Sequence, residues 1–354
     1  MQSILTLPIN STTIDCQSTL RYKEDCLWLD FIAKENAPDI HLWICNTYKQ
    51  GNLLKDVCIS STDNVKVSFD KTVIEAIKSN GSIIHLKLNR VDFEYKNINM
   101  EYCYVINVPP SCIDGLSEKN KVYDTMVDGK HVCFEYNDEN ATILKCSEDI
   151  KDFIIGVISF YFCCPVEILQ EYKIEDNRNV VTIRSRKKNF HADENAAKFH
   201  SKTDSFAEFL GKVKLTHPRW RDFPRYARQY VDSTFVSEPQ RYCMLFAIIS
   251  SFAEYILESR KGEKGYPSGD QLAVDTFKYF GKDKSAIDNV IKDKGLKRGN
   301  SDIKTVAELR NESEHNLFSN LSYAFLEDNP KINLFMDEIA TRIIFDFMKV
   351  EYFE

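Results

Sequence analysis

Three residues in the later part of the chain combine a proton-transfer group with an anion-binding group. Arg310, Asn311 and His315 stand in the segment LRNESEH, so that the arginine and the histidine are five positions apart. Histidine exchanges a proton near neutral pH, and arginine stays charged and can bind two oxygens of one anion. Asparagine can donate or accept a hydrogen bond that orients either side chain. Such a set could perform acid–base chemistry on an anionic substrate without a metal ion.

A long helix over residues 303 to 327 is predicted to position these groups. One stripe at helical spacing should face the core, and it contains Val306, Leu309, Ser313, Leu317 and Leu321. With Leu309 as zero, Arg310 falls at ~100°, Asn311 at ~200° and His315 at ~240° around the helix. These side chains are therefore expected to point away from the core, with Glu314 at ~140° among them. A solvated face of surface residues is the competing interpretation of the same pattern.

The segment LRNESEH resembles the Arg-polar-spacer-His signature (R-x4-6-H) of the HEPN superfamily, with a spacer of four residues here. The order of helices around it is similar to the Apea-like branch: an earlier helix with AIISSFAEYILES precedes it, and an apolar helix follows it. The resemblance covers roughly the last 135 residues, the size of a compact domain. It implies a helical bundle that acts as a ribonuclease in toxin, abortive-infection or antiphage defence systems, in which growth arrest protects the population.

The resemblance implies a role for each residue of the motif. His315 would move the proton as the RNA 2′-hydroxyl attacks the phosphate, Arg310 would stabilise the transition-state charge, and Asn311 would orient them. Arg310 and His315 are ~140° apart around one helix, so a single copy makes a poor site. The resemblance implies that two protomers pack these helices together and that both copies of each residue line one cleft, so a homodimer is expected. RNA is then the substrate, and a trigger or inhibitory protein is a further expected partner.

Two acidic residues inside the motif count against that activity. Glu312 and Glu314 put negative charge beside the proposed phosphate site and would lower the affinity for RNA. The alternative is a HEPN-like bundle without catalysis, which serves as a dimerising adaptor or sensor. Arg310 and His315 would then make interface hydrogen bonds. On the preceding helix, Arg241 and Glu254 could form a structural contact.

Alternation and turn residues divide the chain into two domains. Period-2 patterns and short Gly-, Pro- and Asn-rich turns predict antiparallel strands in the first half, at 41 to 48, 64 to 69, 82 to 95, 102 to 108, 131 to 136, 141 to 146 and 179 to 188. A helix is expected from Ser147 to Phe162, and everything beyond Pro218 is expected to be helical. The predicted fold class is α+β: a mostly antiparallel β-rich recognition or regulatory domain at 1–205, then an all-α, HEPN-like bundle at 206–354.

A second candidate site precedes the bundle. Arg219, Trp220, Arg221 and Arg225 alternate basic with aromatic residues, a combination that can hold single-stranded RNA through phosphate contacts and stacking. A solvated linker face is the competing interpretation, since the chain as a whole is acidic, with 46 Lys and Arg against 53 Asp and Glu.

Composition excludes several classes of protein. The 354 residues are 43% hydrophobic and 28% charged, which is typical of a folded globular chain. The 11 cysteines form no CxxC pair, and no histidines have metal-ligand spacing, so no metal and no cofactor are expected. The odd cysteine count, the lack of a signal-like start and an apolar run of only about 12 residues predict a cytoplasmic protein without a membrane span.

Overall fold

We describe the protein from a computed structural model. It describes residues 2–9, 12–23, 26–32, 42, 58–60, 65–68, 74–80, 83–88, 90–95, 102–138, 141–175, 178–184, 205–256, 270–298, 301–315 and 325–352. The chain forms two compact units. The first contains Met1–Asp124, His131–Glu148 and Val166–His191, and the second contains Thr125–Lys130, Asp149–Pro165 and Ala192–Glu354. The segment Asp149–Pro165 therefore belongs to the same unit as the C-terminal helices. The sequence placed it in the first domain.

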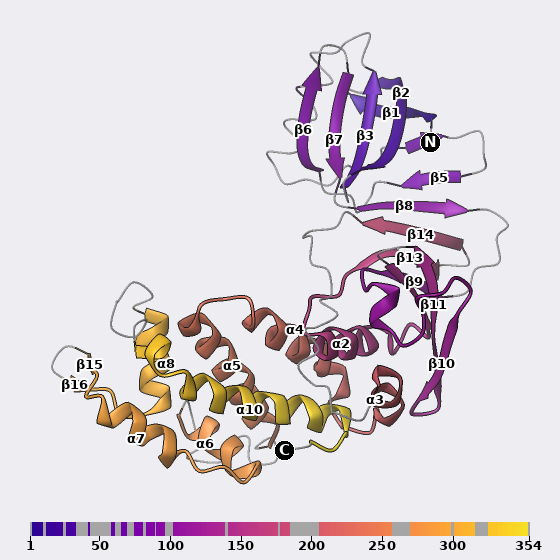
Figure 1. Ribbon diagram of the computed structural model, residues 1–354. Coiled ribbons are helices and arrows are strands. Elements are labelled where there is room, and N and C mark those ends of the chain that lie inside the picture. The colour runs from indigo at the N-terminus through magenta and orange to yellow at the C-terminus, as the bar shows by residue number, and fades with distance from the viewer. Residues whose placement is uncertain are drawn as a thin grey trace. The chain divides into compact units, whose positions relative to one another are not determined.

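One large sheet makes up most of the first unit, and only Thr125–Val127 and Lys130 of its strands belong to the second (Figure 1). Its strands are β1 (Gln2–Ile9), β2 (Thr12–Lys23), β3 (Cys26–Ile32), β4 (Cys58–Ser60), β5 (Val65–Ser68), β6 (Ile74–Asn80), β7 (Ile83–Leu88), β8 (Arg90–Tyr95), β9 (Cys103–Ile106), β10 (Val122–Val127), β11 (Lys130–Asp138), β12 (Ala141–Cys146), β13 (Ile168–Glu175) and β14 (Arg178–Arg184). The order across the sheet is β10-β11-β12-β9-β13-β14-β8-β5-β4-β1-β2-β3-β7-β6. Neighbouring strands from β11 to β6 are antiparallel.

Strand alternation separates a buried face from a polar face in β3 and β7. Ile84, Leu86 and Leu88 are buried, while His85 and Lys87 between them are half-buried. This is the period-2 pattern on which the strand at 82 to 95 was predicted. The neighbouring strand β3 follows the same rule, since Leu29 lies opposite Leu86 in the register and is also buried. Successive side chains of a strand point to opposite faces, so this one pattern fixes the register of both strands.

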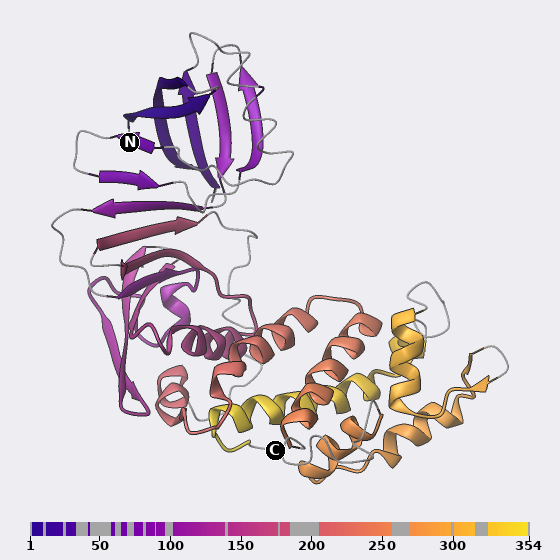
Figure 2. The same cartoon turned by 180° about the vertical axis from the view of Figure 1, so that it is seen from behind.

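The second unit is mainly helical (Figure 2). Its elements are α2 (Lys151–Phe162), α3 (Phe206–Lys212), the short 3-10 helix η2 (Trp220–Asp222), α4 (Phe223–Ser233), α5 (Glu238–Ile256), α6 (Asp270–Tyr279), α7 (Ser285–Asp293), β15 (Lys297–Arg298), β16 (Ser301–Asp302), α8 (Val306–His315) and α10 (Pro330–Met348). Helix α4 contacts α2 and α5, α10 contacts α4 and α5, and α8 contacts α5. Helices α4 and α5 therefore form the centre of this unit.

Aromatic rings fill the contact between α2 and α4. Phe153 lies 4.6 Å from Phe223, centroid to centroid, and Phe160 lies 5.4 Å from Tyr230. Gly156 permits the close approach, because a Cβ atom there would lie 2.9 Å from Cε1 of Phe223. Burial of these large apolar side chains stabilises the contact between α2 and α4.

The α+β class predicted from the sequence is confirmed, with a largely antiparallel sheet and helices concentrated in the C-terminal half. Several expectations need correction. The region beyond Pro218 is not entirely helical, since Lys297–Arg298 pairs with Ser301–Asp302 in a small hairpin. The strands β1, β2, β3, β4, β6, β10 and β13 were not predicted from the sequence. The single strand expected at 82 to 95 is two strands, β7 and β8. The expected strand at 41 to 48 lies outside the described residues except for Leu42, which is exposed.

Candidate functional site

Helix α8 carries the Arg-Asn-x-x-x-His motif, and its start is fixed by a capping box. The Thr305 backbone N–H donates to the Glu308 carboxylate at 3.1 Å, and the Glu308 N–H donates to the Thr305 hydroxyl at 3.3 Å. These reciprocal hydrogen bonds satisfy backbone donors that the first turn leaves without helical partners. The helix therefore begins at Val306, three residues later than the sequence predicted.

The buried side of α8 packs on α5. Val306, Leu309 and Ser313 are fully buried, which confirms the predicted core stripe as far as the described residues extend. The hydroxyl of Tyr242, on α5, donates a 2.6 Å hydrogen bond to the Val306 carbonyl. Leu317 and Leu321, the rest of the predicted stripe, lie outside the described residues.

Arg310 and Asn311 are in direct contact on α8. Nη1 of Arg310 donates to Oδ1 of Asn311 at 2.9 Å, and both side chains are half-buried. The Arg310 guanidinium also lies 5.9 Å from the ring centroid of Phe246, on α5. The predicted outward orientation is thus only partly realised, because Arg310 leans against the neighbouring helix.

The acidic residues of the motif are not equivalent. Glu312 is only 5% exposed, so its carboxylate lies on the buried side of α8, away from the solvent-facing surface. The side chains of Glu314 and His315 lie outside the described residues, although His315 is the last residue of α8. The predicted approach of His315 to Arg310 therefore stays a prediction.

The second candidate site begins at a buried histidine. His217 is 1% exposed, and its Nδ1 accepts the Arg219 backbone N–H at 3.1 Å. Its Nε2 lies 3.4 Å from Oδ2 of Asp346, on α10, and the Phe347 ring covers it with centroids 4.4 Å apart. Burial alone would raise the pKa of Asp346, but His217 and a 2.8 Å hydrogen bond from Lys349 outweigh it and lower that pKa. This histidine therefore anchors the start of η2 to α10.

The four residues predicted to bind RNA have different environments. Arg219 is engaged in an ion pair with Asp222, Nε to Oδ2 at 2.6 Å. Arg221 and Arg225 are exposed and lie over aromatic rings, 5.4 Å from the Trp220 centroid and 5.2 Å from the Tyr226 centroid. Trp220 itself is half-buried. Arg221 and Arg225 are therefore accessible to solvent, whereas Arg219 is bound to Asp222.

Aromatic contacts hold the two rings that carry these arginines. Trp220 meets Phe153 of α2 edge to face, with centroids 5.8 Å apart, and Tyr226 lies 4.8 Å from Phe347 of α10. Burial raises the pKa of Tyr226, although the charge of Arg225 opposes that shift. The rings are therefore fixed by the core, and the guanidinium groups rest on a rigid surface.

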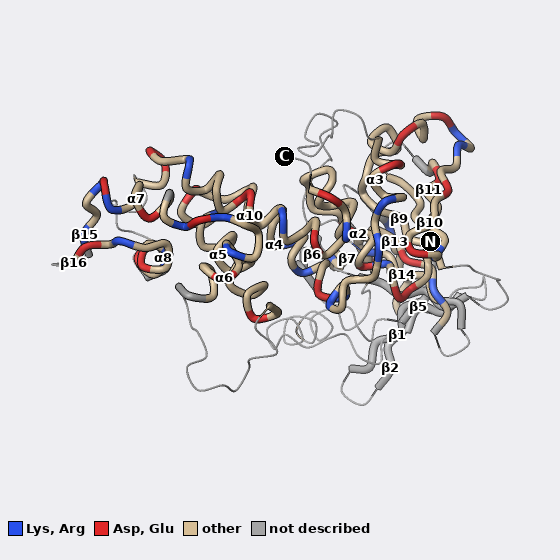
Figure 3. The backbone as a smooth tube through the Cα atoms, turned by 90° about the horizontal axis from the view of Figure 1, so that it is seen from below, with Lys and Arg blue, Asp and Glu red and all other residues tan. Residues whose placement is uncertain are grey.

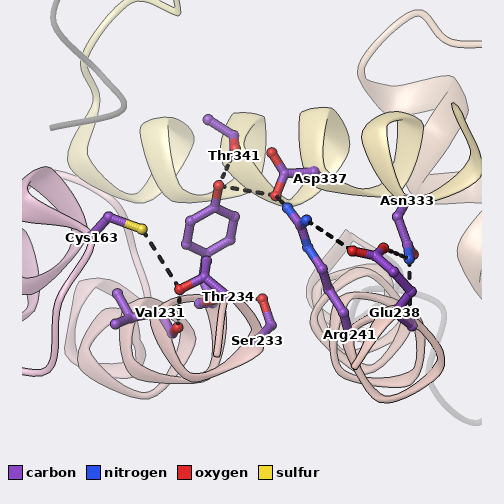
Figure 4. A network of polar contacts seen from close by, with 10 residues as sticks. Cys163, Val231, Ser233, Thr234, Glu238, Arg241, Asn333, Asp337 and Thr341 are labelled. Carbon is purple, nitrogen blue, oxygen red and sulfur yellow. Dashed lines mark hydrogen bonds and ion pairs between the residues drawn. The ribbon is translucent and has the colours of Figure 1, made fainter. Parts of the chain in front are cut away.

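A polar network that sequence reasoning missed joins α4, α5 and α10 (Figure 4). Oδ1 of Asp337 accepts from Nη2 of Arg241 at 2.6 Å and from the Tyr230 hydroxyl at 3.2 Å. Asn333 donates to the Glu238 backbone carbonyl at 3.0 Å. Burial, and then the charge of Asp337, raise the pKa of Tyr230, so this phenol is a hydrogen-bond donor at neutral pH.

The contact that the sequence allowed between Arg241 and Glu254 is not formed. Arg241 pairs with Asp337 and, at 3.9 Å, with Glu238, whereas Glu254 is exposed. The two predicted partners are thirteen residues apart on one straight helix, a separation of about 20 Å along its axis. A sequence signal for the true pair is absent, because Asp337 stands 96 positions further along the chain.

Positive and negative segments alternate over the helices of the second unit, as the colours of Figure 3 show. Within the described ranges, no group of three or more His, Cys, Asp or Glu side chains is placed to hold a metal ion. Among the described helices, none is both long and apolar enough to span a membrane.

Comparison with known proteins finds no match. No protein-family model matches the chain, and no curated protein and no solved structure is significantly similar to it.

Proposed function

We propose that the second unit is a metal-independent endoribonuclease of the HEPN type. It would act in antiphage defence, abortive infection or toxin–antitoxin growth arrest in the cytoplasm. The observation that carries the proposal is the contact between Arg310 and Asn311 on α8, with Nη1 to Oδ1 at 2.9 Å. His315 ends the same helix, five residues further on.

The contact gives Arg310 a defined orientation for its chemical role. A guanidinium has five N–H groups, and the bond to Asn311 uses one of them to orient the group. A planar guanidinium can bind two phosphate oxygens. Stabilising the charge that develops on those oxygens lowers the barrier to cleavage. His315 would exchange the proton of the 2′-hydroxyl or of the leaving 5′-oxygen.

The position of Glu312 removes one objection to RNA binding at α8. The repulsion between a carboxylate and a bound phosphate falls as the distance between the two charges grows. Since Glu312 is buried, its carboxylate is on the opposite side of the helix from a substrate bound by Arg310. Glu314 is then the motif carboxylate whose effect on RNA affinity has to be measured.

A complete site would need two copies of α8. Arg310 and His315 are ~140° apart around one helix, too far for both to face one phosphate from a single copy. A two-fold dimer would place Arg310 of one protomer near His315 of its partner. A trigger or inhibitory protein would act through the first unit, because the motif provides chemistry and no choice of target.

The second candidate function is a dimerising adaptor without catalysis. It is favoured by the position of Arg310 against the Phe246 ring, which is also how an arginine packs when it serves only the fold. Both functions predict a dimer, so the oligomeric state cannot separate them.

Cleavage of total RNA and tRNA in the presence of EDTA separates the two functions. We expect wild-type protein to leave cyclic-phosphate ends, and the His315→Ala variant to lose cleavage while its dimer, measured by light scattering, stays intact. His131→Ala is the matched control, since His131 has a 62% exposed side chain in the first unit and should cleave normally. Inactivity of wild-type protein as an intact dimer, or equal cleavage by His315→Ala, would overturn the ribonuclease proposal.

A further inference from the structure

Three arginines form an exposed row on η2 and α4, which we call the α4 arginine stripe: Arg221, Arg225 and Arg228. Arg221 and Arg225 are exposed, and the side chain of Arg228 is 84% exposed. Their spacing of four and three residues places all three on one face of the continuous helical path from η2 into α4. The row spans about 10 Å along the axis.

The stripe differs in its partners from five other arginines of the chain. Five arginine side chains elsewhere in the described part of the chain pair with carboxylates: Arg21 with Asp30, Arg184 with Glu171, Arg219 with Asp222, Arg241 with Asp337 and Arg342 with Glu338. Arg221 and Arg225 have no carboxylate partner among the described residues and rest on Trp220 and Tyr226 instead. Arg228 has only a long contact of 3.7 Å with Asp232.

The neighbouring acids are occupied in a way that leaves the stripe positive. Asp222, next to Arg221 in the sequence, is bound by Arg219 at 2.6 Å. Although the chain has a net charge of −7, the exposed guanidinium groups of Arg221 and Arg225 therefore have no carboxylate partner among the described residues. An anionic ligand would supply a counter-charge, and two guanidinium groups already ordered by stacking would lose little side-chain entropy on binding it.

We propose that the α4 arginine stripe binds the phosphate backbone of single-stranded RNA. The row presents a series of planar donors, each able to bind two phosphate oxygens, and the half-buried Trp220 ring lies at its start. Arg219, which sequence alone places in this site, positions the stripe by binding Asp222 and does not bind the RNA. The choice of RNA as the polyanion rests on the proposed ribonuclease function, and the stripe would hold the strand that α8 cuts.

The experiment measures binding separately from cleavage. Full-length His315→Ala protein is titrated into a fluorescently labelled 12-nucleotide oligouridine, and anisotropy is followed over a series of salt concentrations. The Arg221→Gln/Arg225→Gln variant is compared with Lys292→Gln/Lys294→Gln, which removes the same charge from two exposed lysines at the end of α7. Thermal unfolding of each protein confirms that the fold is retained.

We expect removal of two phosphate contacts to lower the slope of log affinity against log salt by about 1.4, since each contact with a single strand contributes about 0.7. At 0.1 M salt this corresponds to an affinity roughly 25-fold weaker, relative to 1 M. The lysine control should bind like the parent protein. Equal weakening in the control would show a general effect of charge and would overturn the proposal, as would an unchanged slope in the arginine variant.

Failure of this proposal and failure of the proposed function give different results. If wild-type protein cuts RNA and the arginine variant binds and cuts equally well, the stripe has no role and the ribonuclease stands. If the stripe variant loses binding while wild-type protein cuts nothing, the RNA site stands and the ribonuclease falls. A DNA duplex that competes as well as oligouridine would overturn the preference for single strands.

Discussion

Arg241 and Arg225 lie on adjacent helices of the second unit, yet they have opposite environments. Arg241, with an 18% exposed side chain, is bound by Asp337, whereas Arg225 is exposed and is placed by the face of the Tyr226 ring. A buried guanidinium needs a carboxylate, because removal from water without a counter-charge is costly. An exposed one can be positioned by a ring and keep its hydrogen-bonding edge for a ligand. The partner of each arginine, more than its residue type, indicates whether it holds the fold or faces a ligand.

The largest effect on stability is expected at the buried pair of Arg241 and Asp337. Asp337→Ala would leave Arg241 without its 2.6 Å partner and would remove the acceptor of the Tyr230 hydroxyl. We expect the free energy of unfolding to fall by about 3 kcal/mol, the cost of breaking a buried pair by removing one partner. Urea denaturation of the variant measures it.

Asp328→Ala is the matched control, since Asp328 is exposed just before α10. Its unfolding midpoint should stay close to that of the wild type. If Asp337→Ala were as stable as this control, Arg241 would be energetically like a surface arginine, and the contrast with Arg225 would disappear.

A smaller effect is expected where α2 supports α4. Gly156→Ala would bring a Cβ to 2.9 Å from the Phe223 ring and to 3.3 Å from Cα of Pro224, at the start of α4. Such overpacking costs roughly 1–3 kcal/mol, so the unfolding midpoint should fall. Gly211→Ala is the control, because there the nearest atom, Oγ1 of Thr125, is 3.6 Å away. Equal stability of the two variants would show that the α2–α4 contact adjusts freely and does not hold α4 in place.

Part of this arrangement could be predicted from the sequence. Helical spacing located the buried stripe of α8 correctly at Val306, Leu309 and Ser313, since a period of 3.6 residues is a local property. Alternation at Ile84, Leu86 and Leu88 likewise located a strand. The same alternation was present at Leu27, Leu29 and Phe31, so β3 could have been found from its signal.

Other features depend on contacts between distant segments and leave no local pattern. Arg219 and Arg221 look alike in the sequence, and only the structure shows that one binds Asp222 and the other rests on Trp220. The pair of Arg241 and Asp337 brings together positions 96 residues apart. Hydrophobic periodicity predicts which face of a helix is buried, but the partner of a given polar group depends on tertiary packing.

The contact between His217 and Asp346, which holds the start of η2 on α10, predicts a stability that depends on pH. The pKa of Asp346 is lowered in the folded protein, so its ionised form stabilises the fold at neutral pH. This contribution is complete above the unfolded-state pKa, near 3.8, and is lost as the pH falls through the lower folded-state value. Asp346→Asn should therefore lower stability at pH 7 by about one hydrogen bond, ~1 kcal/mol, and flatten the acid limb of stability against pH. Asp293→Asn, at an exposed position, should leave that limb unchanged.

The smallest effect on stability is expected at the exposed end of the comparison. Arg221→Gln/Arg225→Gln removes two guanidinium groups that have no carboxylate partner in the described part of the chain and that rest on rings already fixed by Phe153 and Phe347. The free energy of unfolding should change by no more than about 0.5 kcal/mol for each substitution, as at other surface positions. The same urea titration used for Asp337→Ala measures it. A loss of 2 kcal/mol or more would place these arginines in the same structural class as Arg241, since stacking on a ring would then be holding α4 together. A change close to zero, together with a weaker dependence of RNA affinity on salt, would assign the two side chains to ligand binding. A residue that does not stabilise the free protein but contributes to binding has its partner outside the chain.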